Sequence, residues 1–362
     1  MGTLVFIVVL SVLVIVHEYG HFVVAKSLGV KVERFAIGFG PKIIGKTFNG
    51  TEFLICLVPL GGYVKMAGDE RSECKGERDE FYSKPVGLRS LVVVAGPIVN
   101  YVFAFLCFCI VFFVGYPTMT TQVGELVDDY PAVKAGLAVG DKILSIGSEK
   151  MDSWEDVQKY IANSKDSKLD MVVLRGSKKE SILLASVLTT SENIFGQKIE
   201  SRVVGIKPKE EIVLLRYGVA ESILKAFEKL KDITFTTYKA LYLMVTGSMS
   251  AKDAVTGPIG IFYIIKKAAT MGFSYVMYIM AVISASLAIF NLLPFPVLDG
   301  GHLLLFGIER IKGKPLSQKV DDVIHRVGFS FIICLAVFVF YTDFVRYGIF
   351  DKIIQFGHHL GF

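Results

Sequence analysis

The chain has 362 residues, of which 52% are hydrophobic and 20% charged, with a net charge of +5 and a mean hydropathy of +0.54. Soluble domains contain about 45–50% apolar residues, so this composition argues against an ordinary soluble protein and predicts a membrane protein. The basic residues follow no basic-aromatic pattern, which argues against nucleic acid as a partner. The five cysteines include no CxxC pair, which argues against a metal site built from sulfur ligands.

Four apolar segments approach the roughly 20 residues that a membrane-crossing helix needs. They are Met1–Ala25, Leu91–Tyr116, Phe273–Leu293 and Val327–Tyr341. The first has neither the basic start nor the small-residue cleavage site of a secretory signal, so we expect it to be retained. The segments predict a polytopic α-helical membrane protein with about four transmembrane helices.

The first apolar segment contains the motif His17-Glu18-Tyr19-Gly20-His21. In a helix, His17 and His21 lie at positions i and i+4 on one face, where their imidazole nitrogens can bind one Zn²⁺. Glu18 is placed to act as a general base toward water. In a soluble helix the same letters would more simply be surface residues. Ionisable groups in an apolar span are costly and usually functional, so the motif predicts a catalytic zinc site.

A β-rich stretch, residues 32–66, follows this segment. Its runs are Val32–Ile37, Thr51–Val58 and Gly62–Met66, and glycine-rich turns separate them. The apolar part Phe53–Met66 is too short, and too interrupted by Pro59, to cross a membrane. Two arrangements fit: a re-entrant β-hairpin whose backbone is covered by protein or lines a cavity, or an ordinary soluble hairpin on the cytoplasmic face.

A polar loop, Asp69–Lys84, precedes the second apolar segment. Gly96, Pro97 and Asn100 lie near the start of that segment. Small and polar residues in a span permit close helix approach or a hydrogen bond within lipid, although ordinary helix packing explains these three more simply. Residues 1–116 are thus predicted to form two transmembrane helices around the histidine motif and the β-rich region.

A soluble pattern replaces the apolar segments over residues 121–208. The predicted strands are Val123–Val127, Lys142–Ile146, Leu169–Arg175, Ser181–Leu188 and Arg202–Ile206, with a short helix over Ala132–Ala135. Ser153 and Asp156 predict a capping box for a helix over Trp154–Ala162. The sequence PAVKAGLAVGD at Pro131–Asp141, followed by KILSIG, resembles a PDZ domain of the bacterial protease type. Such domains bind extended chain ends by adding a strand to a sheet edge, and one copy is visible.

Residues 217–272 are predicted to form an amphipathic helix and a connecting segment. Between Tyr217 and Val245, apolar residues recur at helical spacing on one face, with lysines and acids between them. Periodicity leaves two positions open for this helix, on the outer membrane surface or packed against the spans.

The last two apolar segments lie in residues 273–362, and NLLPFPVLDG at Asn291–Gly300 interrupts the first of them. Catalytic zinc takes three protein ligands and a water, so two histidines leave one ligand missing. We expect Asp299 to supply it. Alone, Asp-Gly after two prolines would be a simple turn, but the histidine motif favours the metal role. His302 either competes for the metal or, as we prefer, hydrogen-bonds to a ligand or is structural.

The distribution of Lys and Arg predicts an orientation, because short loops rich in these residues tend to stay cytoplasmic. Residues Lys26–Arg89 contain eleven of them, and five more lie between the third and fourth apolar segments. Both regions are therefore expected on the cytoplasmic side. The N-terminus, the C-terminus and the PDZ-like domain are then outside, and the metal site lies toward the cytoplasmic side.

Together these motifs resemble the site-2 protease family, M50. HEYGH, GPIVN, the PDZ-like insert and NLLPFPVLDG match its pattern, while GFGPK, PLGGYVKMAGDE, FYSKPVGLRS and GPIGI resemble its regulator-of-sigma-E protease branch. The resemblance covers nearly the whole chain. It implies a bacterial inner membrane location and zinc held by His17, His21 and Asp299, with Glu18 as the catalytic base. Some members of the branch carry two tandem PDZ domains where this chain shows one, which puts gating by a paired PDZ filter in doubt.

The resemblance also implies where the substrate binds. Asn291 would bind or polarise the substrate near the metal, and Phe53–Met66 would be a re-entrant β element that takes the substrate as an added strand. The implied contacts in this element are Phe53, Leu54, Gly61, Gly62 and Tyr63.

As a whole, the sequence predicts an intramembrane zinc metalloprotease that binds one Zn²⁺ and cuts single-span membrane proteins in or near their transmembrane segments. The resemblance suggests two kinds of substrate: anti-sigma factors already cut by another protease, and signal-peptide remnants. The PDZ-like domain is expected to bind chain ends. Two other classes compete with this prediction, a non-catalytic membrane PDZ scaffold and a zinc transporter. The complete set of His17, Glu18, His21 and Asp299 argues against the scaffold.

Overall fold

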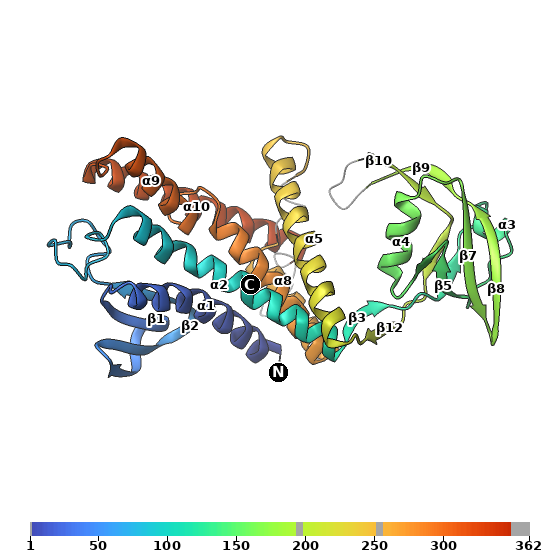
Figure 1. Ribbon diagram of the computed structural model, residues 1–362, viewed down its shortest axis with the longest axis horizontal. Coiled ribbons are helices and arrows are strands. Elements are labelled where there is room, and N and C mark those ends of the chain that lie inside the picture. Colours follow the sequence, from blue (N-terminus) through green and yellow to red (C-terminus); the bar gives the residue numbers. More distant parts are fainter. Residues whose placement is uncertain (1, 193–197, 251–255, 349–362) are drawn as a thin grey trace, which may run out of the picture. The chain divides into compact units, whose positions relative to one another are not determined.

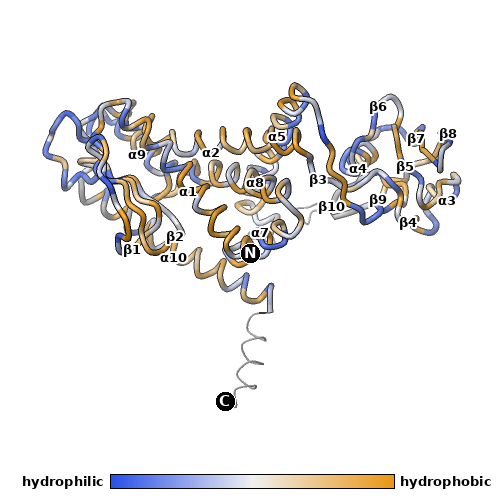
Figure 2. Tube along the Cα trace, turned by 90° about the horizontal axis from the view of Figure 1, so that it is seen from below, coloured by the Kyte–Doolittle hydropathy of each residue, from blue (hydrophilic) through white to orange (hydrophobic). Residues whose placement is uncertain are grey.

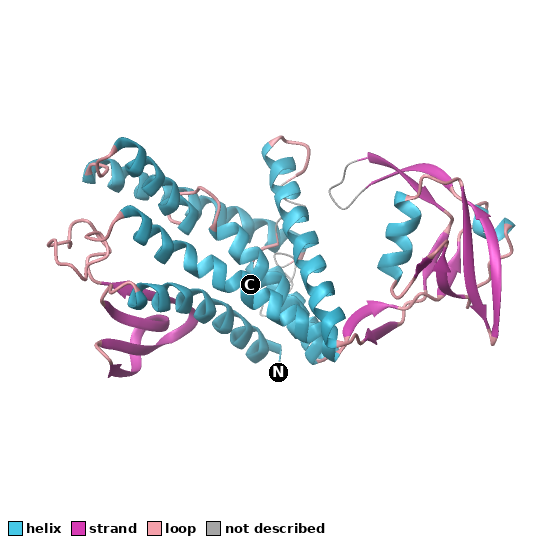
Figure 3. Ribbon diagram, viewed as in Figure 1, coloured by secondary structure: helices cyan, strands magenta, loops and turns pink. Residues whose placement is uncertain are grey.

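The computed structural model of this protein describes residues 2–192, 198–250 and 256–348 (Figure 1). The chain divides into two units, which we describe separately. Unit 1 comprises Met1–Ile110, Ile223–Lys239 and Ala251–Phe362, and unit 2 comprises Val111–Ser222 and Ala240–Ser250. Helices dominate unit 1, whereas strands dominate unit 2 (Figure 3).

Four helices among the described residues are long and apolar enough to cross a membrane. They are α1 (Gly2–Ser27), α2 (Val86–Val114), α8 (Phe273–Asn291) and the part Arg326–Arg346 of α10 (Gln318–Arg346). The predicted number of apolar segments is thus confirmed by length and composition, and the hydrophobic colour runs along α1, α2 and α8 in Figure 2. Both α2 and α10 begin earlier than predicted, because backbone hydrogen bonds continue a helix into polar sequence.

The strands β1 (Val32–Phe48) and β2 (Thr51–Met66) pair with each other in a sheet that lies between α1 and α2 in the chain. Both strands bend, so that residues 34–37 pair with residues 62–65 on one side and with residues 52–55 on the other. The bends coincide with glycines that have positive φ, +88° at Gly38 and +132° at Gly61. Residues 62–66 form one edge of the sheet, with no strand on their other side among the described residues.

The β-rich runs and glycine turns predicted for residues 32–66 are confirmed, but one pairing is missing from the prediction. Residues 42–48 pair with residues 51–56, across a turn in which Asn49 and Gly50 have φ of +47° and +77°. The missed run reads KIIGKTF, where adjacent isoleucines and a glycine hide the alternation that marks a strand.

Two helices of unit 1 were not predicted. After α5 (Val219–Val245), which confirms the predicted amphipathic helix, α7 (Pro258–Met271) lies where we expected only a connecting segment. Its start is capped from α10: the Asp343 carboxylate accepts hydrogen bonds from the Gly257 N–H at 3.1 Å and the Gly260 N–H at 2.9 Å. The other helix, α9 (Asp299–Lys312), begins where a simple turn was the alternative.

A buried ion cluster joins α2, α9 and the loop that follows β2. Glu309 of α9 accepts hydrogen bonds from Arg89 at 2.6 Å and from Arg71 at 2.8 Å, and both guanidinium groups face the ring of Tyr82. Burial raises the pKa of the Glu309 carboxyl, but these hydrogen bonds outweigh it and hold the pKa below its usual value. Because losing one partner would leave a buried charge unpaired, the cluster fixes the loop against the helices.

In unit 2, a four-stranded antiparallel sheet has the strand order β6-β5-β7-β8. Its strands are β5 (Lys142–Ile146), β6 (Glu149–Lys150), β7 (Lys168–Arg175) and β8 (Lys178–Ala185). Three further antiparallel pairs are β4 (Val123–Leu126) with β11 (Ile206–Pro208), β9 (Val187–Glu192) with β10 (Lys198–Val203), and β3 (Tyr116–Met119) with β12 (Ile212–Leu215). The helices are α3 (Pro131–Lys134) and α4 (Trp154–Asn163).

The core of unit 2 is apolar and follows the predicted alternation. Ile143, Met171 and Val173 are among its fully buried side chains. Ser153 forms the predicted capping box with Asp156, and both of its hydrogen bonds are present at the start of α4. The strands predicted over residues 181–188 and 202–206 are each divided between two observed strands, because the chain turns within them.

Candidate metal centre

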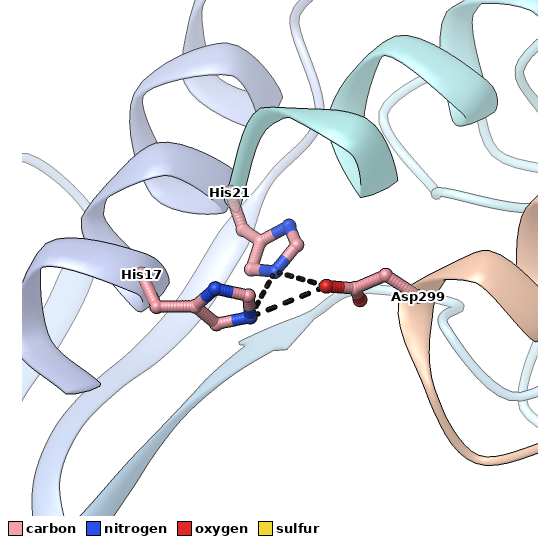
Figure 4. Close-up of side chains that lie close together, drawn as sticks. All are labelled: His17, His21 and Asp299. Atoms are coloured by element: carbon pink, nitrogen blue, oxygen red, sulfur yellow. Dashed lines mark hydrogen bonds and ion pairs between the residues drawn. The ribbon is translucent and has the colours of Figure 1, made fainter. Parts of the chain in front are cut away.

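Two neighbouring side chains of α1 and one from a distant part of the sequence meet in unit 1 (Figure 4). His17 Nε2 lies 3.2 Å from His21 Nε2 and 3.2 Å from Asp299 Oδ2, and His21 Nε2 lies 3.6 Å from the same oxygen. Figure 4 shows the two imidazole rings of α1 directing these nitrogens at the carboxylate, which comes from the start of α9. The structure therefore brings together the three residues that were expected to bind a metal.

The spacing of these atoms fits a metal ion. Zinc binds histidine nitrogen and carboxylate oxygen at about 2.0–2.2 Å, and a tetrahedron with such bonds places its ligand atoms about 3.3–3.6 Å apart. Asp299 Oδ2 is buried and has no hydrogen-bond partner among the described residues. A buried anionic oxygen needs a cation, and two nitrogens with one oxygen leave a tetrahedral position open, as catalytic zinc sites do.

Close contact between α1 and α2 positions the two histidines. Gly20 lies against α2, where a Cβ on Gly20 would come 2.5 Å from the Ala95 carbonyl oxygen. A Cβ on Gly96 would come 2.3 Å from His21 Nε2 and 2.8 Å from His17 Cε1. Glycine at both positions lets α2 pack directly against the rings.

The backbone of α2 orients His21. Nδ1 of His21 lies 2.9 Å from the backbone carbonyl oxygen of Val92. A carbonyl oxygen only accepts hydrogen bonds, so Nδ1 carries the ring proton and Nε2 presents its lone pair to the metal position.

A tight loop between α8 and α9 holds Asp299. Val297 in this loop has a φ of +80°, which is strained for a β-branched residue. The two glycines after Asp299 allow the loop to close: a Cβ on Gly300 would come 2.3 Å from a preceding carbonyl oxygen, and a Cβ on Gly301 2.1 Å from another. Asp299 and Gly300 therefore begin a helix that packs on its own loop.

A cavity of about 560 Å³ adjoins the metal centre. Glu18, His21 and Asp299 lie on its wall, together with residues 64–66 of the sheet edge and polar residues of the loop after β2. A Cβ on Gly62 would lie 3.5 Å from Glu18 Cγ, so the same edge passes beside this carboxylate. The cavity gives the metal centre polar surroundings next to an unpaired strand edge.

The residues implied to bind substrate in β2 take different positions. Gly62 lies beside Glu18, as described above. Leu54 is 7% exposed, buried within the sheet, and Phe53 packs against Phe22 with 5.7 Å between the ring centroids. These two side chains contribute to packing and do not line the cavity.

Gly61 and Tyr63 gather around Phe39 of β1. The rings of Tyr63 and Phe39 stack at 6.4 Å, and a side chain on Gly61 would collide with the Phe39 ring. Asn291 is the last residue of α8 and does not line the cavity, whereas His302 does.

Gly96 and Asn100 of α2 contribute to the centre, although ordinary helix packing was the simpler expectation for them. Asn100 Nδ2 lies 3.3 Å from His17 Nδ1. Gly96 and Asn100 are four residues apart in an apolar helix and therefore lie on the same face. A glycine and an amide on one face of a span were the signal that could have revealed this contribution.

Unit 2 has a groove of its own, with a cavity of about 420 Å³. Trp154, Val157 and Ile161 of α4 line one side, and residues 201–207 of β10 and β11 line the other. An apolar helix face beside a strand is the arrangement in which PDZ domains take an added strand.

Comparisons with known proteins place the chain in a family. The profile of peptidase family M50 matches residues 5–335. A protein of Mesorhizobium japonicum, named as a zinc metalloprotease, is 33% identical over 364 residues, covering 95% of this chain and 98% of the relative. The regulator of sigma E protease of Haemophilus influenzae is 30% identical over 436 residues, covering 94% of this chain and 98% of the relative.

Among solved structures, the PDZ domain of an SdrC-like protein from Listeria monocytogenes matches 24% of this chain and 84% of that chain, at 23% identity and a TM-score of 0.20. The family match covers most of α1, all of α2 and α8, the first part of the apolar stretch of α10, and both segments that carry the metal-facing residues. The chain belongs to peptidase family M50.

Proposed function

We propose that this protein is an intramembrane zinc metalloprotease of the site-2 type, which cuts single-span membrane proteins in or near their transmembrane segments. The observation that carries the proposal is the meeting of His17, His21 and Asp299 at 3.2–3.6 Å beside Glu18, on helices long and apolar enough to cross a membrane. Suitable substrates are membrane-anchored anti-sigma factors already cut by another protease, and signal-peptide remnants.

In this proposal His17, His21 and Asp299 hold one zinc ion, and Glu18 is the general base. When bound, zinc supplies a Lewis acid that polarises a carbonyl and makes water nucleophilic near neutral pH. Glu18 is half-buried on the wall of the same cavity. Its carboxylate takes a proton from the attacking water and passes it to the leaving nitrogen.

The edge of the sheet is the proposed substrate platform. A helical substrate hides its peptide bonds in i→i−4 hydrogen bonds, so cleavage needs an extended segment. Residues 62–66 offer an unpaired strand edge beside Glu18, and added-strand pairing would hold the substrate extended there. Phe53, Leu54, Gly61 and Tyr63 then support the platform, with Asn291 proposed to contact the substrate from the end of α8.

Residues 121–208 are proposed to be a single PDZ-like domain that binds extended chain ends in the groove beside α4. The alignment with the Haemophilus protein runs over 436 positions, more than the 362 residues of this chain. That relative therefore contains sequence that this chain lacks, as expected where a second PDZ domain is missing.

The proposed location is the bacterial inner membrane, with residues 1–116 and 273–362 forming the membrane part and residues 217–272 linking it to the PDZ-like domain. The eleven Lys and Arg residues of Lys26–Arg89 favour a cytoplasmic position for the sheet. The PDZ-like domain and both termini are then periplasmic, and the residues of both termini fall partly outside the described residues. Cysteine-reactive labelling from each side would test this orientation.

The Glu18→Gln variant of the full chain tests the proposed chemistry. Reconstituted with a single-span test protein, it should keep one zinc per chain, by elemental analysis, and lose cleavage about 10²–10⁴-fold on gels, the usual contribution of a general base. Asp299→Ala should lose the zinc as well, because two histidines remain. Glu33→Gln changes an exposed glutamate of β1 and is the matched control, with zinc and cleavage unchanged.

Each competing class gives a different result. A non-catalytic scaffold would show no stoichiometric zinc and no cleavage by the wild-type chain, whereas a transporter would move zinc across vesicles without cleaving the test protein. Cleavage by Glu18→Gln at the wild-type rate would remove Glu18 from the mechanism.

A further inference from the structure

Asn100 has a polar side chain that is buried within an apolar helix, where an amide is energetically unfavourable. It lies within α2, is 0% exposed, and its Oδ1 has no hydrogen-bond partner among the described residues. A buried amide oxygen without a hydrogen-bond partner is energetically unfavourable. The side chain is directed at the metal centre, where Nδ2 lies 3.3 Å from His17 Nδ1.

The metal position decides which proton His17 carries. His17 Nε2 faces His21 and Asp299, so binding a metal through Nε2 requires a lone pair on that atom. A neutral imidazole with a lone pair on Nε2 carries its proton on Nδ1. The group facing His17 Nδ1 must then be an acceptor.

The amide of Asn100 provides that acceptor when its two ends are exchanged. Oxygen and nitrogen of an amide have nearly the same shape, so their assignment follows from the hydrogen bonds. With Nδ2 toward His17 Nδ1, two donors face each other once a metal is bound. With Oδ1 toward His17 Nδ1 instead, the ring N–H gains an acceptor. The NH₂ group of Asn100 then occupies the position that Oδ1 has in the structure, where no partner faces it among the described residues. One amide atom lacks a protein partner in either orientation, so the demand of His17 decides between them.

The other histidine of the centre shows the same arrangement. His21 Nδ1 donates to the Val92 carbonyl oxygen, which is also in α2, two turns before Asn100. The helix α2 thus faces the Nδ1 of both imidazoles, one through its backbone and one through a side chain. The backbone carbonyl oxygen of Asn100 accepts a hydrogen bond from Ser284 of α8 at 2.8 Å, which does not involve the side-chain amide group.

We propose that Asn100 is a positioning residue for the metal ligand His17: its side-chain oxygen accepts the Nδ1 proton and holds Nε2 toward the metal. The proposal rests on the proposed zinc centre, and zinc binding by the wild-type chain tests that centre separately.

The experiment compares two substitutions of similar size, Asn100→Leu and Asn100→Asp. Zinc affinity is measured on the detergent-solubilised full chain by competition with a chromogenic chelator. Asn100→Leu removes the acceptor and should weaken zinc binding about 10–100-fold, the usual effect of losing a group that orients a ligand. Asn100→Asp keeps an acceptor toward Nδ1 and should bind zinc about as tightly as the wild type, because a carboxylate raises the basicity of the ring.

Ser284→Ala is the control for helix packing. It removes the hydrogen bond to the Asn100 backbone without altering the amide, and its zinc affinity should match the wild type. Equal losses of zinc affinity in Asn100→Leu and Asn100→Asp would overturn the proposal, because the acceptor would then be irrelevant. Wild-type zinc affinity in Asn100→Leu would overturn it as well. Should Asn100→Leu fail to fold, Asn100→Asp still decides, because an amide that donated to Nδ1 would lose zinc affinity on becoming a carboxylate.

Discussion

The buried interior of unit 2 and the buried centre of unit 1 are built in opposite ways. In unit 2, apolar side chains such as Ile143 and Met171 fill the space between sheet and helix. In unit 1, the polar residues His21 and Asn100 are buried within apolar helices, at 8% and 0% exposure. Removing one methylene from an apolar core lowers the free energy of unfolding by only about 0.5–1.5 kcal/mol. The polar centre depends instead on the positions of single atoms, so the two regions should respond differently to changes of the same size.

Gly96→Ala is the change with the largest expected effect. One methyl group at this position would lie 2.3 Å from His21 Nε2, so the ring or the helix must move. A displacement of about 1 Å at a catalytic centre costs on the order of 10²-fold in rate. We expect zinc content to fall and cleavage of a single-span test protein to drop by about that factor or more, while the circular dichroism spectrum keeps its helical content.

Gly87→Ala is the matched control for this substitution. It makes the same change in the same helix, and a Cβ there would meet nothing within 4 Å. Zinc content and cleavage should stay at wild-type values. Equal effects of the two substitutions would mean that α2 responds to helix propensity and not to the contact with the histidines.

A pH effect of intermediate size is expected in the loop after β2 of unit 1. The Glu80 carboxylate accepts hydrogen bonds from the backbone N–H groups of Lys75, Gly76 and Glu77 at 2.8–3.0 Å. The Lys75 N–H contributes most, and together with the Cys74 thiol these donors lower the pKa of Glu80 from 4.5 to about 2. The ionised carboxylate therefore stabilises the loop fully above about pH 4.5, and this stabilisation is lost as the pH falls through about 2.

Hydrogen exchange of the three amides, corrected for its intrinsic pH dependence, measures this effect. Protection should be constant above about pH 4.5 and should decline steadily toward pH 2. In Glu80→Gln the protection should be weaker and independent of pH. A wild-type loop whose protection does not change over this range would show that the carboxylate is not what organises it.

Ser153→Ala in unit 2 should have the smallest effect. It removes the hydroxyl of the capping box at the start of α4, which typically costs about 1 kcal/mol in the free energy of unfolding. The only tryptophan of the chain, Trp154, is buried in unit 2, so its fluorescence follows the unfolding of this unit in the intact protein. Ser177→Ala, at an exposed turn position, is the control and should leave unfolding unchanged.

Much of the fold was predictable because it follows repeating patterns. The apolar segments, the capping box at Ser153 and the strand alternation of unit 2 are all local features that the sequence displays directly. The helix α7 escaped prediction because its start depends on Asp343, a cap from a distant helix. Residues 42–48 of β1 escaped because their pairing, and not their own pattern, makes them a strand.

The ligands of the candidate metal centre were predictable because a metal ion requires particular side-chain types. A pair of histidines needs a third ligand, and Asp299 was the best candidate because it interrupts an apolar segment. The contacts that orient the ligands were not predictable in the same way. Val92 acts through its backbone carbonyl, which any residue type supplies, and Gly96 acts through the absence of a side chain, which is a signal only together with Asn100 on the same face.

The distance along the chain between the histidines and Asp299 has a consequence for synthesis. His17 and His21 leave the ribosome early, whereas Asp299 follows only after all of unit 2 has been made. A partly synthesised chain therefore holds two of the three proposed ligands and cannot retain a catalytic zinc. Under the proposed function, cleavage of neighbouring membrane proteins therefore begins only after α9 has joined α1.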